Sequence, residues 1–179
     1  AAITETLVNS STNPIVVHYL ITPTLNGCVG TPFDVAVTVN PTSVITSSAT
    51  ANWCDNAATA YTITSSTVPE PVFTWSRATV SGISNAPVSS SGATISEALD
   101  NTTTDPIVVH YSITPTINGC AGTTFDLAVT VNPTSIVTSS ATANWCNAVS
   151  NTYDITSSTT PEPVFTWSRA EVTGITPAT

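Results

Sequence analysis

Residues 105–133, DPIVVHYSITPTINGCAGTTFDLAVTVNP, have the pattern of two β-strands joined by a tight turn. Each half alternates apolar and polar positions, which is the period of a strand with one buried face. The inward positions are Ile107, Val109, Tyr111 and Ile113 in the first half and Phe125, Leu127, Val129 and Val131 in the second. Between the halves, Asn118-Gly119 supplies residues that tolerate positive φ, as hairpin turns require. We therefore expect a β-hairpin with one shared apolar face.

The same stretch recurs almost unchanged at residues 13–41, and the recurrence extends over the whole chain. Equivalent residues lie 92 positions apart without a gap, as Ile3 and Ile95 do (95 − 3). A fixed long period of this kind marks a tandem array of one module.

The module boundaries are predicted from Val-Asn-Pro at residues 39–41 and 131–133, because proline ends a strand. On that division, residues 1–40 are the C-terminal half of a β-sandwich repeat, residues 41–132 a complete module, and residues 133–179 the N-terminal half of the next repeat. Two explanations fit a chain that starts and stops inside a module. It is either a window cut from a continuous array, or a subunit whose two half-modules complete those of its neighbours.

Several short strands are expected inside the complete module. They lie near residues 43–49, 60–65, 72–80 and 93–99, with a short edge strand within 82–92 and the hairpin at the end; residues 51–56 are expected as a loop. About seven strands in about 90 residues predict an all-β, immunoglobulin-like sandwich. A small β-barrel fits the same pattern.

Composition and charge exclude several classes of function. The chain is 41% hydrophobic and only 7% charged, and its net charge is −9, with two arginines and no lysine. Nucleic acid is not expected as a partner, since phosphate binding needs a basic patch. Anionic membrane surfaces are disfavoured for the same reason, and no apolar run has membrane-spanning length, so we expect no membrane insertion.

Four cysteines occupy two repeating positions: Cys28, Cys54, Cys120 and Cys146. In a lysine-free β-chain rich in Thr and Ser they indicate an oxidising extracellular compartment. One hypothesis pairs Cys54 with Cys120 inside the module. In an immunoglobulin-like topology, however, those two loops lie at opposite ends of the sandwich, too far apart for the ~5.5 Å Cα separation of a disulfide. The alternatives are bridges from each module to its neighbours and free thiols, because connectivity does not follow from sequence alone.

The spacing of these cysteines does not favour a metal centre. Consecutive cysteines lie 26 or 66 residues apart and form no C-x-x-C pair, unlike the ligands of zinc fingers and ribbons. No Asp-x-Asp-x-Asp loop is present, which leaves calcium open only at a joint between modules. Because GxSxG and HExxH are also missing, we expect no metal, no cofactor and no enzymatic activity.

Arg77 and Glu97 each lie on a predicted strand in phase with core residues, and both recur, as Arg169 and Glu5. An inward guanidinium must be paired, so we predict a partly buried ion pair between Arg77 and Glu97. His18 and His110 fall on the outer face of their strand. Without an accompanying nucleophile or oriented carboxylate, such histidines favour surface or joint packing over catalysis.

The aromatic residues divide into two groups. One group is expected in the core: Phe73, Trp75, Tyr111, Phe125 and Trp167. The other, Trp53 and Trp145, follows a polar stretch beside cysteine. Those two tryptophans are expected either to pack across a domain joint or to stack on a sugar ring.

Three phrases carry a resemblance to a known family. They are ITPTxNGCxGxxFDxAVTVNP at residues 21–41 and 113–133, SSATANWC at 47–54 and PEPVFTWSRA at 69–78. The chain resembles the PKD-like repeats of giant secreted surface adhesins of gliding, Bacteroidota-type bacteria. It departs from typical PKD domains after Trp75, where Ser76-Arg77-Ala78 replaces the usual Asp and Gly residues. The resemblance implies an elongated, exported adhesin or filament stalk.

Our leading hypothesis is a non-catalytic structural repeat of an extracellular rod or filament. Its expected partners are neighbouring copies of the same repeat, in the same chain or in another subunit. The alternative is a carbohydrate-binding module, with the loop tryptophans as platforms and surface polysaccharide as partner. A third class, an accessory domain of a secreted hydrolase, requires a catalytic domain elsewhere in the parent chain.

Overall fold

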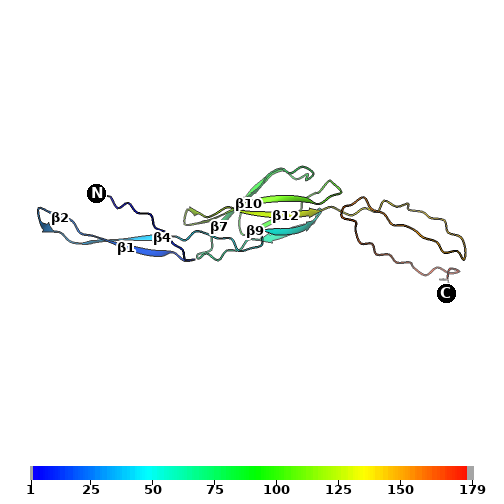
Figure 1. The fold of residues 1–179 in the computed structure, drawn as a ribbon, viewed down its shortest axis with the longest axis horizontal. Coiled ribbons are helices and arrows are strands. Elements are labelled where there is room, and N and C mark those ends of the chain that lie inside the picture. The colour runs from blue at the N-terminus through cyan, green and yellow to red at the C-terminus, as the bar shows by residue number, and fades with distance from the viewer. Residues whose placement is uncertain (1, 177–179) are drawn as a thin grey trace.

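The structure is a computed structural model that describes residues 2–176. These residues form strands, turns and extended loops, and none of them belongs to a helix that could cross a membrane. Three segments follow one another along the long axis of the molecule: residues 2–40, the complete module, and residues 133–176 (Figure 1). The molecule is therefore elongated.

The first segment contains one long hairpin. Strand β1 (Ile15–Ile21) pairs antiparallel with β4 (Phe33–Val39), and the short strands β2 (Thr24–Leu25) and β3 (Cys28–Val29) extend the hairpin toward its tip. No further strand of residues 2–176 pairs with either outer edge of β1 and β4. Among the described residues, both outer edges of this hairpin are therefore left without a paired strand.

The complete module is a sandwich of two sheets, which confirms the immunoglobulin-like, all-β prediction. Its larger sheet has the strand order β5-β12-β10-β7-β8, with β11 also paired to β10. The strands are β5 (Thr50–Cys54), β7 (Val72–Arg77), β8 (Val88–Ser91), β10 (Ile107–Ile117), β11 (Cys120–Ala121) and β12 (Phe125–Asn132). The smaller sheet pairs β6 (Thr59–Thr62) with β9 (Thr94–Glu97). Because the larger sheet ends in the edge strands β5 and β8, it does not close into a barrel.

The hairpin β10–β12 forms as the alternation predicts. Ile107 faces Val131 and Ile113 faces Phe125, and the turn has positive φ at Asn118 (47°) and Gly119 (81°). Strand β10 runs four residues beyond the predicted Ile113 and includes Pro115. That proline lies opposite the break between β11 and β12, so its missing N–H costs the ladder little.

The segment around Trp53 differs from its prediction. Residues 51–56 were expected as a loop, whereas Thr50–Cys54 is strand β5, parallel to β12 with Cys54 opposite Asn132. Conversely, the predicted strand at 43–49 is reduced to one bridge between Ile45 and Ser65. Because β5 is short and its partner lies far along the chain, the local pattern gives little sign of it.

The third segment repeats the course of residues 41–84 without a partner sheet. Its one bridge, between Val137 and Ser157, is the counterpart of Ile45 with Ser65, and no residue from 141 to 176 is in a strand. Trp167, predicted as a core residue, is 81% exposed here, whereas its counterpart Trp75 is 8% exposed. The core prediction is wrong for Trp167 because no sheet packs against it.

The core lies between the two sheets of the complete module. It consists of Trp53, Tyr61, Ile63, Phe73, Trp75, Ile83, Ile95, Leu99, Val109, Tyr111, Ile113, Leu127, Val129 and Val131, with Phe125 partly buried at its edge. The ring of Tyr111 lies 6.0 Å from both Trp53 and Trp75, measured between centroids. Three aromatic rings from three strands therefore meet at the centre of the module.

The repeat supplies a matched pair of tryptophans for a stability measurement. We expect Trp53→Ala to lower the free energy of unfolding by about 3–5 kcal/mol, because it empties a core position. Trp145 stands in a nearly identical sequence but is 62% exposed. Trp145→Ala should therefore lower the free energy of unfolding by less than about 1 kcal/mol. Denaturant titration of dilute, monomeric protein, followed by near-UV circular dichroism, measures both; equal losses would contradict the packing described here.

Candidate functional site

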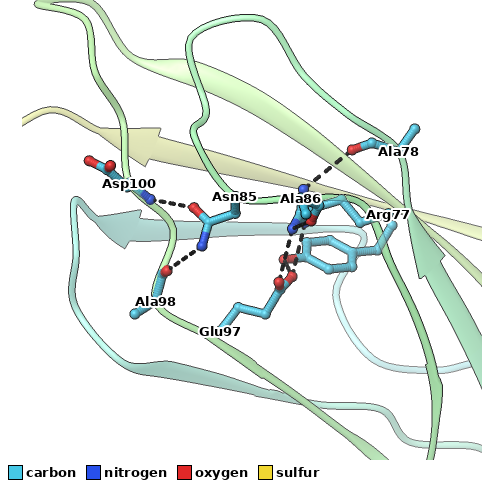
Figure 2. A network of polar contacts seen from close by, with 8 residues as sticks. Arg77, Ala78, Asn85, Ala86, Glu97, Ala98 and Asp100 are labelled. Carbon is cyan, nitrogen blue, oxygen red and sulfur yellow. Dashed lines mark hydrogen bonds and ion pairs between the residues drawn. The ribbon is translucent and has the colours of Figure 1, made fainter.

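A polar network joins the two sheets of the complete module (Figure 2). Arg77 is the last residue of β7 in the larger sheet, and Glu97 is the last residue of β9 in the smaller one. Arg77 Nε and Nη2 donate to the two carboxylate oxygens of Glu97, each at 3.0 Å. The pair is therefore bidentate, which is the geometry that a planar guanidinium and a carboxylate favour.

Two further donors of Arg77 bond to backbone carbonyl oxygens. Nη2 donates to the carbonyl oxygen of Ala86 at 2.7 Å, and Nη1 donates to that of Ala78 at 3.3 Å. Tyr111, the strand partner of Arg77 in β10, donates its hydroxyl proton to Glu97. Every charged group of the network thus has several partners, as a buried charge requires.

Burial and pairing shift the pKa values of all three side chains. The hydrogen bonds to Glu97 raise the pKa of Arg77, against the opposing effect of burial. Burial pushes the pKa of Glu97 upward, but the hydrogen bonds from Arg77 and Tyr111 and the charge of Arg77 outweigh it and lower that pKa. Burial, and then the bond to Glu97, raise the pKa of Tyr111. At neutral pH the network is therefore a fixed ion pair capped by a neutral phenol, suited to holding sheets together rather than to transferring protons.

The same network is divided between the two end segments. In residues 2–40, Tyr19 donates to Glu5 at 2.5 Å, as Tyr111 does to Glu97. Arg169, the counterpart of Arg77, lies in the third segment, where its Nη1 donates to the carbonyl oxygen of Ala170 at 3.2 Å. Among residues 2–176, no acidic side chain forms a salt bridge with Arg169.

The two histidines lie on the exposed face of their hairpins. His110 Nδ1 lies 2.8 Å from Asp126 Oδ2, and His18 Nδ1 lies 2.8 Å from Asp34 Oδ2. In the first pair the side chains are 60% and 63% exposed. Each histidine therefore has an oriented carboxylate beside it, contrary to the expectation from the sequence. Exposed pairs of this kind contribute little to stability.

The structure does not bring Cys54 and Cys120 together. Cys54 lies opposite Asn132 at one end of the larger sheet, whereas Cys120 pairs with Ile117 at the far end of β10. The length of β10 separates them by about 35 Å at the usual rise of a strand. A disulfide within the module is therefore incompatible with this fold, and all four cysteines are exposed free thiols.

The tryptophans beside the cysteines occupy different environments. Trp53 is 3% exposed and belongs to the core, so the expectation of a joint or sugar contact is wrong for this residue. Its indole packs on Tyr111 because β5 joins the larger sheet beside β12. Trp145 is exposed. In the described part of the chain, no three His, Cys, Asp or Glu side chains gather closely enough to bind a metal ion.

The ion pair gives a pH-dependent prediction. Glu97→Gln leaves Arg77 buried without a counter-charge, and we expect it to lower the free energy of unfolding by about 3–5 kcal/mol at pH 7. The pKa of Glu97 is lowered on folding, so its stabilising effect is complete above the unfolded value of 4.5 and is lost as pH falls through the folded value. The difference between wild type and variant should therefore shrink below about pH 4.5.

Asp126→Asn is the matched control, because it removes a carboxylate from an exposed pair of the same module. We expect this change to alter stability by less than about 0.5 kcal/mol at any pH. Denaturant titrations of both variants between pH 3 and pH 8 make the comparison. A loss for Glu97→Gln that is no larger than that of the control would show that the network does not join the sheets.

The fold agrees with a comparison to known protein families. The model of the PKD-like domain matches residues 1–43 and 51–135, which together make up more than half of the chain. No curated protein matches the chain. Because this match spans more than half of the residues, the chain belongs to the PKD-like domain family.

Proposed function

We propose that this chain is a non-catalytic structural repeat of an extracellular rod, such as the stalk of a surface adhesin of gliding, Bacteroidota-type bacteria. Membership of the PKD-like family supports a structural or adhesive module of this type. The Arg77–Glu97 pair, at the centre of the polar network, joins the two sheets of the module. The proposed function therefore depends on the joints between successive modules.

The observation that carries the proposal is a joint that occurs twice with the same geometry. Val68 N donates to the carbonyl oxygen of Thr12 in the preceding segment at 2.8 Å. At the next joint, 92 residues on, Thr160 N donates to the carbonyl oxygen of Thr104, again at 2.8 Å. Because two successive joints are alike, an array of these modules extends in equal steps.

Buried hydroxyls brace both joints on the same side. Thr67 is 4% exposed and accepts a hydrogen bond from Val44 N at 3.1 Å, and Thr159, 8% exposed, accepts one from Ile136 N at 3.2 Å. These bonds hold the connecting segment against the loop that reaches back to the preceding module. These hydrogen bonds therefore fix the direction in which the chain leaves each joint.

A second contact supports the first joint. The tip of the β10–β11 hairpin reaches Asn40, whose Oδ1 accepts from Asn118 Nδ2 at 3.0 Å. Gly122 lies so close to the connecting segment that a Cβ there would meet Ser43 O at 2.6 Å. Contacts from two separate loops resist bending, whereas a single flexible linker would not.

Extracellular location is part of the proposal. A chain with no lysine, two arginines, many Thr and Ser residues and cysteines at repeating positions suits an oxidising compartment. The carbohydrate-binding alternative has lost one platform, because the indole of Trp53 is buried. The rod is therefore the function that the geometry supports better.

Surface location can be measured on intact cells that make the protein. We expect antibodies against residues 41–132 to label unpermeabilised cells. Brief treatment of the same cells with an external protease should remove that label while a cytoplasmic marker survives. Labelling that appears only after permeabilisation would contradict an extracellular rod.

The stiffness of the joint is tested with a pair of glycine variants. Gly122→Ala places a Cβ against the backbone of Ser43, so the connecting segment must shift and the joint should loosen. Gly30→Ala is the matched control at the equivalent hairpin position, where the added Cβ meets only Pro23 of its own hairpin. Small-angle X-ray scattering should show a broader distribution of dimensions for Gly122→Ala alone; equal distributions would contradict a braced joint.

A further inference from the structure

The two cysteines of the complete module lie at its two different joints. Cys120, near the tip of the β10–β11 hairpin, faces the preceding segment, and its Sγ lies 3.9 Å from Nδ2 of Asn40. Cys54, the last residue of β5, lies at the other end of the larger sheet. Asp55, which follows it, accepts a hydrogen bond from Thr134 Oγ1 in the next segment at 2.8 Å. Each joint therefore has one cysteine of this module beside it.

Both cysteines lie beside the same position of the repeat. Cys54 is the strand partner of Asn132. Asn40, the neighbour of Cys120, is the counterpart of Asn132 one period earlier (132 − 40 = 92), and each asparagine directly precedes the proline that begins a connecting segment. At a joint between two complete modules, the asparagine is therefore approached by Cys54 of its own module and by Cys120 of the module that follows.

The distances around that asparagine suit a disulfide. Residues in register on parallel strands project from the same face, on strands about 4.8 Å apart, so the side chain of Cys54 lies beside that of Asn132. The hairpin tip is held against Asn40 by the bond from Asn118 Nδ2 at 3.0 Å, which keeps Cys120 Sγ close to the same amide group. A disulfide joins residues whose Cα atoms are about 5.5 Å apart. Two sulfur atoms that flank one asparagine side chain are within reach of that geometry.

The turn and the sheet hold both cysteines in place before any bond forms. Cys120 pairs with Ile117 at the hairpin tip, and Cys28 pairs with Leu25 at the equivalent tip of the first segment. The same turn therefore presents a cysteine at the same place in both copies. Cys54 is held by the pairing of β5 with β12. All three thiols are exposed, so an oxidant in solution reaches them.

From this convergence we propose that successive modules of the rod are linked by a disulfide between Cys54 of one module and Cys120 of the module that follows. The proposal rests on the rod function and assigns a covalent bond to its joint. The bond forms when the two thiols lose two protons and two electrons, which a low-molecular-weight disulfide accepts as it is reduced to two thiols. Because the two cysteines of a module serve different joints, each joint of an array receives one bridge.

The test uses an extended chain in which residues 41–132 occur twice in succession between residues 1–40 and 133–179. The inserted copy adds one Cys54 and one Cys120 to the four cysteines of the original chain, which makes six. Dilute protein is equilibrated with reduced and oxidised glutathione, its thiols are alkylated with iodoacetamide, and the cysteines that carry either group are counted by intact mass.

We expect two of the six cysteines to be protected in the extended chain, because it contains one joint between two complete modules. The original chain contains no such joint, so we expect none of its four cysteines to be protected. Six modified cysteines in the extended chain, or two protected cysteines in the original chain, would overturn the proposal.

The same substitution in each of the two copies provides a matched control. Cys54→Ser in the first copy removes the expected partner of Cys120 in the second, so all five remaining cysteines should become modified. Cys54→Ser in the second copy removes a thiol that has no partner in this chain, so two cysteines should stay protected. Near-UV circular dichroism checks that both variants are folded. Equal counts for the two variants would overturn the pairing.

The outcome is separable from that of the rod function. Labelling of intact cells and scattering of the reduced chain involve no disulfide, so they test the rod without the bridge. If those tests succeed while the extended chain shows no protected cysteines, the rod function stands and the bridge fails. If the bridge forms but cells are labelled only after permeabilisation, the bridge between modules stands and the extracellular rod fails.

Discussion

The bidentate contact between Arg77 and Glu97 is the interaction on which the arrangement of the two sheets depends. A buried guanidinium is tolerated only where its donors are satisfied, and a carboxylate from the facing sheet satisfies two of them. Tyr111 lies directly opposite Arg77 in β10 and also bonds Glu97, so the contact reaches three strands. An offset between the sheets by one residue would break all three bonds at once, which fixes their alignment.

The features that the sequence predicts well are those carried by neighbouring residues. Alternation and Asn-Gly define the β10–β12 hairpin, and the fixed 92-residue period divides the chain before any coordinate is known. Arg77 and Glu97 each share the alternation of core residues on their strand, and this pattern is enough to predict that both side chains face inward. Their meeting could be predicted because the complete module offers a single arginine and the burial of that charge demands a partner.

The features that the sequence does not predict depend on distant partners. Strand β5 offers only Ala51 and Trp53 as inward positions, too few to show a period, and it is defined by parallel pairing with β12 more than 70 residues away. Trp167 stands in the same local sequence as Trp75 yet is exposed. Burial is a property of what packs against a residue, and nothing in the local pattern of Trp167 records whether that partner is present.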